Sequence, residues 1–204
     1  MSVRCGRSER AKPYPSVEGY STIPAWSRGA SPWNQLSPMK LGPFVVDDEE
    51  VQIFENYWQS KIYQCDLIDE TKPIEINNLK TSYWERRTEL FKSTKAKRRA
   101  LPKAKYGVPI AGYYHGQIMG YVESRKLVYC PIYTALVEQH PIFLQLKEKY
   151  NNGEKLLIIG PDGSNHNEEL TLEILRERIN DPTRIFGHEL VLCCLLMDYK
   201  VWEN

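Results

Sequence analysis

The chain has 204 residues, of which 42% are hydrophobic and 26% are charged, as in an ordinary folded protein with a buried core. Its net charge of +1 excludes a protein whose whole surface is built to attract nucleic acid or anionic membrane. No apolar run approaches the roughly 18–20 residues of a membrane span, and the N-terminal residues lack the apolar stretch of a secretory signal. We therefore expect no membrane association and a cytoplasmic or otherwise intracellular location.

The cysteines and histidines argue against a disulfide framework and a metal centre. The five cysteines form no CxxC pair, and Cys193 and Cys194 are adjacent in an apolar stretch that predicts buried thiols. Such an odd, scattered set suits a reducing compartment. The four histidines match no metal-ligand spacing, and no dinucleotide-binding or Walker-type glycine loop is present. We therefore expect no metal ion and no cofactor.

Residues 1–34 differ in composition from the rest of the chain. They are rich in Ser, Gly, Pro and Arg, and they also carry four large aromatic side chains: Tyr14, Tyr20, Trp26 and Trp33. A purely disordered tail would contain fewer aromatics. The composition predicts an extended N-terminal arm that lies against its own domain or on a protein partner, followed by a globular domain over residues 35–204.

Beyond the arm, the hydrophobic pattern predicts helices with a few strands. Residues 41–54 fit a short strand, an acidic turn and a second apolar element, and residues 54–64 have helical composition. Residues 82–99 fit an amphipathic helix with Ser82 as its N-cap. Residues 106–118 are rich in glycine and predict a loop or an irregular strand pair.

The second half of the chain gives clearer signals. Pro131 and Pro141 each begin a predicted helix, and the apolar run of residues 155–160 is the clearest strand. Residues 170–180 fit an amphipathic helix, and a last helix over residues 187–202 is apolar nearly all round, which predicts burial. We therefore predict an α+β fold: a single compact domain, mostly helical with a small sheet.

The first candidate for chemistry lies in the predicted helix of residues 54–64. Glu55 and Gln59 are one helical turn apart and share a face, and Trp58 lies beside them. A carboxylate next to a carboxamide and an aromatic ring can bind a sugar or a base and assist cleavage of a glycosidic bond. An exposed Glu–Gln pair over a buried tryptophan explains the same residues without function.

The second candidate is a basic stretch over residues 92–105, and no acidic residue occurs between Glu89 and Glu123. These cations would attract the phosphates of a nucleotide or a nucleic acid, and the tyrosines just beyond them can stack on bases. A solvated helix end explains the stretch equally well. The cations are Lys92, Lys95, Lys97, Arg98, Arg99, Lys103 and Lys105.

The third candidate is the loop of residues 160–167, which follows the clearest predicted strand. Loops at the carboxyl ends of strands often carry ligand sites in open sheets. Asp162 and His166 are the candidate residues in this loop, with Asp162 expected to bind substrate, and His188, at the start of the last helix, is a candidate pocket or capping residue. A plain Pro-Asp-Gly turn accounts for the loop without function.

Three segments of the chain share their order and spacing with a known domain. SPMKLGPFVVDDEEVQIFENYWQSKIY contains a strand pair followed by a helix that carries Glu, Gln and Lys. YTALVEQHPIFLQLKEKYNNGEKLLI contains a helix, a His-Pro break, a second helix and a strand, and FGHELVLCCLLM forms a closing helix. Over residues 36–199 the chain resembles the NADAR domain family of N-glycosidases, or an uncharacterised relative of it.

The resemblance implies an enzyme that hydrolyses a ribose N-glycosidic bond of an ADP-ribosyl or ribosylaminopyrimidine compound. Glu55 would be the catalytic acid/base, and Lys61 would be the amine that forms an imine with the opened ribose. Trp58 and Gln59 would shape the pocket. The small-molecule partner would be a nucleotide or an ADP-ribose-type compound, and its phosphates would face Arg98, Arg99 or Arg125.

The spacing of Glu55 and Lys61 departs from the family pattern. In the family the lysine follows the glutamate by seven residues, whereas here it follows by six. On one continuous helix, six residues leave the two side chains roughly 120° apart. They converge only if the helix ends or bulges between them, and otherwise the scaffold persists without catalysis.

Two other functions remain open. A non-catalytic structural or interaction protein of a larger assembly, such as a virus particle, would use residues 1–34 as its docking arm. In that case the protein would be located in the virion. A nucleic-acid-binding module would instead use residues 92–105 and the neighbouring tyrosines.

Overall fold

The computed structural model describes residues 2–8 and 14–203, and the chain divides into two compact units. Unit 1 combines Met1–Pro38 with Arg125–Asn204, and unit 2 is the continuous segment Met39–Ser124. The fold class is α+β with helices in the majority, which confirms the predicted class. Among the helices formed by the described residues, none is long and apolar enough to cross a membrane.

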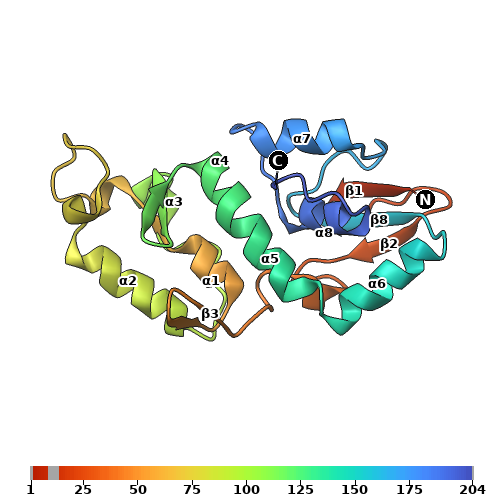
Figure 1. Ribbon diagram of the computed structural model, residues 1–204, viewed down its shortest axis with the longest axis horizontal. Coiled ribbons are helices and arrows are strands. Elements are labelled where there is room, and N and C mark those ends of the chain that lie inside the picture. Colours follow the sequence, from red (N-terminus) through yellow and green to blue (C-terminus); the bar gives the residue numbers. More distant parts are fainter. Residues whose placement is uncertain (1, 9–13, 204) are drawn as a thin grey trace. The chain divides into compact units, whose positions relative to one another are not determined.

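Unit 1 is built on a three-stranded parallel sheet with the strand order β1–β8–β2 (Figure 1). All five residues of the central strand β8 are buried, which explains why its sequence is a continuous apolar run. Helix α8 packs on β1 and β8 and is itself buried along its whole length. The elements of unit 1 are β1 (Val3–Arg7), β2 (Ser21–Pro24), η1 (Trp33–Leu36), η4 (Arg125–Tyr129), α5 (Cys130–Val137), α6 (Pro141–Asn151), β8 (Leu156–Gly160), α7 (Leu172–Asn180) and α8 (His188–Leu196).

The segment predicted as an N-terminal arm supplies both outer strands of this sheet. β1 pairs with β8 on one side and β2 pairs with it on the other, so the backbone of the buried strand finds partners along both edges. The predicted boundary after residue 34 therefore does not separate an arm from a domain. Residues 9–13 of the predicted arm lie outside the described residues.

The predicted helix start at Pro141 is confirmed, whereas Pro131 lies inside the continuous helical run of η4 and α5. The last helix, predicted over residues 187–202, ends at Leu196. α6 begins at Pro141, and the ring of His140 accepts a hydrogen bond from the backbone N–H of Ile142 at 3.2 Å. α7 begins after Thr171, whose hydroxyl oxygen accepts from the N–H of Ile174 at 3.4 Å. These local caps satisfy donors that have no partner inside the helix.

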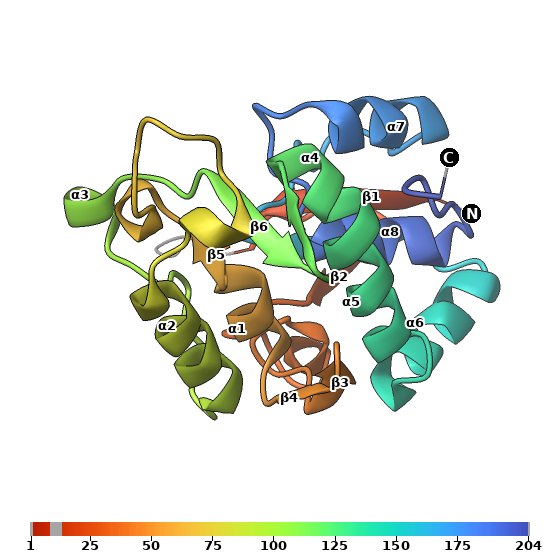
Figure 2. The ribbon, with the colours of Figure 1, turned by 60° about the vertical axis from the view of Figure 1, so that its left-hand side comes forward.

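Unit 2 contains an antiparallel sheet of β5, β6 and β7, a β3–β4 hairpin, and the helices α1 and α2, which pack side by side (Figure 2). Ile62, Leu67, Leu79 and Tyr83 form a buried apolar cluster. The elements are β3 (Phe44–Val46), β4 (Glu49–Val51), α1 (Phe54–Gln59), β5 (Lys61–Ile62), η2 (Gln64–Asp66), η3 (Ile76–Asn78), α2 (Thr81–Lys92), α3 (Lys103–Tyr106), β6 (Ala111–Tyr114), β7 (Gln117–Met119) and α4 (Tyr121–Ser124).

The helix predicted over residues 82–99 is shorter than expected. α2 ends at Lys92, and a loop follows. The buried side chain of Asn56 makes hydrogen bonds of 2.7–3.1 Å with backbone groups of Ser93, Lys95 and Lys97. These contacts supply partners for backbone groups that have left the helix. The second half of the predicted helix is therefore a loop that is fixed by a distant side chain.

Candidate functional site

Helix α1 ends between Glu55 and Lys61, so the two side chains are not tied to one helical period. α1 stops at Gln59, Ser60 leaves the helical conformation with φ −74° and ψ 48°, and Lys61 begins strand β5. The helix predicted over residues 54–64 is therefore too long. Because the helix ends at this point, the side chains of Glu55 and Lys61 can approach one another although only six residues separate them.

The amine of Lys61 lies against aromatic rings. Its Nζ atom is 4.0 Å from the ring centre of Trp58 and 5.7 Å from that of Tyr121, and the two ring centres are 6.5 Å apart. A cation within about 6 Å of a ring face is attracted by the electrons of the ring. Trp58 and Tyr121 therefore position the amine, and Tyr121, which comes from α4, was not predicted to belong to this group.

Burial lowers the pKa of Lys61 to about 8, and the negative charge of Glu55 partly opposes this effect. The charged ammonium loses hydration when it leaves water, whereas the neutral amine loses little. Half of the Lys61 amines are thus neutral near pH 8. A neutral amine is the nucleophilic form, so the environment activates this lysine for attack on a carbon centre.

Glu55 and Trp58 are both held by neighbouring side chains. Gln59 Nε2 donates a hydrogen bond of 2.8 Å to Glu55 Oε1, as the one-turn spacing predicts. The Trp58 ring stacks on Tyr114 with centres 6.0 Å apart and planes 13° apart, and the Tyr114 hydroxyl donates to the carbonyl oxygen of Trp58 at 3.2 Å. Tyr114 is buried, whereas Glu55, Trp58, Gln59 and Lys61 are partly exposed. We call these last four, together with Tyr121, the Lys61 cluster.

Two predicted phosphate-binding residues lie on the loop between α2 and α3. Arg98 and Arg99 are both exposed. The preceding part of this loop is fixed by Asn56, so the basic stretch leaves α2 along a defined path. The assignment of these two arginines to a substrate phosphate stays a prediction.

Arg125 has a different position from the predicted one, because its side chain is buried in unit 1. Its guanidinium group donates to the carbonyl oxygens of Arg178 at 3.4 Å, Asp181 at 2.7 Å and Arg184 at 3.0 Å. A buried cation needs such acceptors to compensate for its lost hydration. Arg125 therefore holds the segment that follows α7, and the expectation that it contacts a substrate phosphate is corrected.

Asp162 and His188 are both near the end of β8 but in different surroundings. Asp162 is partly exposed and lines a cavity, in line with its predicted place in a loop after the strand. His188 is buried, and its Nε2 atom donates to the carbonyl oxygen of Ala25 at 3.0 Å. Burial lowers the pKa of His188 to about 4. His188 is therefore a neutral interior residue, which corrects its predicted role in contacting a substrate.

Comparison of the chain with models of protein families, with curated proteins and with solved structures gives no match. The arrangement of the residues themselves therefore carries the functional argument. The Lys61 cluster combines an activated amine, a carboxyl group and aromatic faces, and it lies wholly within unit 2.

Proposed function

We propose that the protein cleaves a ribose N-glycosidic bond, with Lys61 as the nucleophile and Glu55 as the acid/base. One observation carries the proposal: the Lys61 amine is packed against Trp58 with a pKa lowered to about 8 and with Glu55 close enough to influence it. The resemblance of residues 36–199 to the NADAR family gives the same two residues these roles. The substrate class is an ADP-ribosyl or ribosylaminopyrimidine compound.

The reaction follows from the two groups. A proton first moves from the Lys61 ammonium to the Glu55 carboxylate. The neutral amine then attacks C1 of the ribose, a bond forms between Nζ and C1, and the bond between C1 and the base nitrogen breaks. The leaving nitrogen takes up a proton from the Glu55 carboxyl group, and the carboxylate then accepts a proton from the new ammonium. Opening of the ribose ring converts the adduct to an imine, which water hydrolyses to the free amine and to ADP-ribose or ribose phosphate, according to the substrate.

The aromatic faces give the cluster its selectivity in this proposal. The stacked pair of Trp58 and Tyr114 fixes the indole ring against which the Lys61 amine lies, so a sugar that reaches the amine also meets this ring. Gln59 keeps the Glu55 carboxyl group in one orientation. A positioned carboxyl group contributes about 10²–10⁴-fold to the rate of a proton-transfer step.

The test is turnover of ADP-ribosylated guanosine and of a ribosylaminopyrimidine phosphate, with borohydride added to trap the imine. The native protein should give a stable adduct on the peptide that contains Lys61, as measured by mass spectrometry. Lys61→Met should abolish both turnover and adduct, and Glu55→Gln should reduce turnover about 10²-fold or more.

Lys105→Met is the matched control, because the amine of Lys105 also lies over an aromatic ring, that of Tyr106, at 5.1 Å. This variant should keep full turnover. Turnover that survives in Lys61→Met, or an adduct on another lysine, would contradict the proposal.

A second candidate is binding of single-stranded nucleic acid by the basic stretch. It is favoured by the exposure of Lys95, Lys97, Arg98 and Arg99 on a loop that Asn56 holds in place. Affinity for a single strand should fall steeply with salt, and replacement of these four residues by Gln should remove it. Absence of binding at low salt would exclude this function.

A third possibility, a non-catalytic component of a larger assembly such as a virus particle, relies on residues 1–34 as a docking arm. Part of that segment is already used as β1 and β2 of the sheet in unit 1. A partner would therefore bind the outer faces or edges of these strands, and this role remains the weaker proposal.

A further inference from the structure

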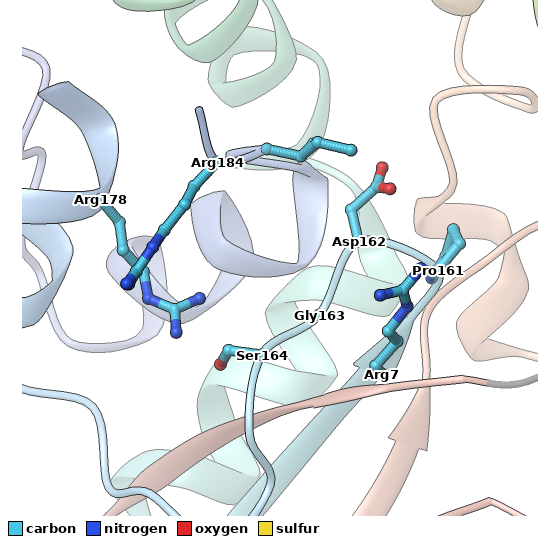
Figure 3. Close-up of a pocket in the computed structure, with 8 residues that line it drawn as sticks. Arg7, Pro161, Asp162, Gly163, Ser164, Arg178 and Arg184 are labelled. Atoms are coloured by element: carbon cyan, nitrogen blue, oxygen red, sulfur yellow. The ribbon is translucent and has the colours of Figure 1, made fainter. Parts of the chain in front are cut away.

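A cavity of about 370 Å³ lies in unit 1 where the parallel strands β1 and β8 end (Figure 3). Its walls come from Arg7, the last residue of β1, from the loop Pro161–Ser164 after β8, and from Arg178 and Arg184 (Figure 3). The volume falls within the range of about 300–1,000 Å³ that is usual for small-molecule sites. Ligands of open parallel sheets commonly bind at this carboxyl edge.

Three arginines surround this cavity, and Figure 3 shows Arg7 on one side of the loop with Arg178 and Arg184 on the other. The Arg178 side chain is only 14% exposed, and its buried Nε atom has no hydrogen-bond partner among the described residues. A buried N–H donor without an acceptor is costly, so a ligand oxygen at this position would be stabilising.

The three acidic groups nearby match the three arginines in formal charge but leave some of their N–H donors available. Arg178 is 3.8 Å from Glu168, Arg184 is 3.3 Å from Asp181, and Asp162 lines the cavity. A guanidinium group has five N–H donors, so one ion pair leaves further donors for a second acceptor. For Arg7, no side-chain hydrogen bond or ion pair with another described residue is present.

The wall of the cavity is held by buried contacts. Arg125 binds the carbonyl oxygens of Arg178, Asp181 and Arg184, and thus fixes the segment that carries two of the arginines. On the loop after β8, the Ser164 hydroxyl donates to the carbonyl oxygen of Cys5 at 3.1 Å. A preformed set of donors binds an anion with little loss of conformational entropy.

We propose that this cavity binds the phosphate group of a small phosphorylated molecule through Arg7, Arg178 and Arg184. Guanidinium groups match the tetrahedral oxygens of phosphate with paired hydrogen bonds, more closely than they match a single-point acceptor. The volume leaves room for a sugar or a nucleoside attached to the phosphate. The site lies within unit 1, and the proposal does not depend on the reaction assigned to Lys61.

Calorimetric titration of the full chain tests this site with four probes: inorganic phosphate, ribose 5-phosphate, AMP and adenosine. The three phosphorylated probes should bind, and adenosine should not. Tighter binding of AMP or ribose 5-phosphate than of inorganic phosphate would assign the ligand to a phosphorylated nucleoside or sugar, and equal binding would assign it to phosphate itself.

Arg178→Gln and Arg184→Gln should each weaken phosphate binding about tenfold or more, since each removes a charge-assisted hydrogen bond. Arg176→Gln is the matched control, because Arg176 is exposed on the same helix two residues away and does not line the cavity. If Arg176→Gln and Arg178→Gln lost the same affinity for phosphate, the binding would come from general charge attraction, and the proposal would be overturned. Absence of binding by the native chain would overturn it as well.

Discussion

The reactivity of Lys61 depends on the groups that surround its amine. Trp58 and Tyr121 provide the ring faces, burial lowers the pKa to about 8, and the charge of Glu55 acts in the opposite direction. The balance of these two effects leaves the amine partly neutral near neutral pH. Removal of either influence should therefore shift the titration of this residue.

The rate at which Lys61 reacts with an acylating reagent should rise with pH, with a midpoint near pH 8. Glu55→Gln should move this midpoint to lower pH, because it removes the negative charge that raises the pKa. Mass spectrometry of the labelled peptides over a pH series measures this, with the Lys105 peptide as an internal reference. An unchanged midpoint in Glu55→Gln would show that the two groups do not interact.

Glu189 is a second residue whose ionisation is set by burial. It lies in the first turn of α8, is buried, and accepts from the backbone N–H of Asp162 at 3.3 Å. Its Oε2 atom is 3.3 Å from His188 Nδ1 but without hydrogen-bond geometry. Burial raises the pKa of Glu189 to about 7 and lowers that of His188 to about 4, so the pair is neutral near pH 6.

The pKa of Glu189 predicts a loss of stability as pH rises. In the unfolded chain this carboxyl ionises near pH 4.3, whereas in the folded chain it keeps its proton until about pH 7. The folded state binds more protons in this window, so its contribution to stability falls between those two values. Glu189→Gln removes this ionisable group, and the stability of the variant relative to the native chain should increase from pH 5 to pH 8 by roughly 2.5 kcal/mol.

Urea unfolding of both proteins at the two pH values measures this change. His188 is present in both, so its own titration largely cancels from the difference. Glu177→Gln, at an exposed position on α7, should give the same stability difference from the native chain at pH 5 and at pH 8. A pH-independent difference for Glu189→Gln would mean that Glu189 is already ionised in the folded protein at pH 5.

At the scale of elements, two connections are held by side chains that are distant in sequence. Asn56 binds the loop after α2, and Arg125 in η4 binds the segment after α7. Each contact satisfies backbone groups that leave regular structure. Replacement of such a side chain should therefore loosen the whole loop that it binds.

Arg125→Lys should destabilise the protein by about 3 kcal/mol, because lysine cannot reach three carbonyl oxygens from one buried position. It should also weaken phosphate binding, since the segment with Arg178 and Arg184 loses its anchor. Lys126→Gln is the control, because its bond to Asn180 is exposed and should contribute less than about 1 kcal/mol. Urea unfolding gives both values, and equal effects of the two changes would contradict this role for Arg125.

At the scale of the whole molecule, the two units are assembled from the chain in different ways. Unit 2 is one continuous segment, whereas unit 1 joins the beginning of the chain to its second half. The sheet of unit 1 depends on this, because β1 and β2 pair with β8 from the far end of the sequence. The near-zero net charge gives no guide to this arrangement.

Deletion of residues 1–8 should therefore affect the two units differently. Removal of β1 leaves one edge of β8 without partners, so amide protection against hydrogen exchange should fall in β8 and β2. Protection in α2 and in the β5–β7 sheet should remain close to that of the native chain. A uniform loss of protection across all of these elements would show that the units unfold as one.

The sequence by itself determined the features whose cause is local. The buried strand at residues 156–160 follows from its apolar run, the start of α6 from Pro141, and the burial of α8 from its apolar faces. The Glu55–Gln59 contact also follows from helical spacing. These signals act over a few residues and so can be read from the order of amino acids alone.

Tertiary structure alone decided the rest. The pairing of β1 and β2 with β8, the position of Tyr121 beside Lys61, and the grouping of Arg7 with Arg178 and Arg184 all join residues that are far apart in sequence. Arg125 was expected at a phosphate and instead satisfies buried carbonyl oxygens. A charged residue carries the same local signature in both settings, and only its burial and its partners distinguish a ligand contact from an internal support.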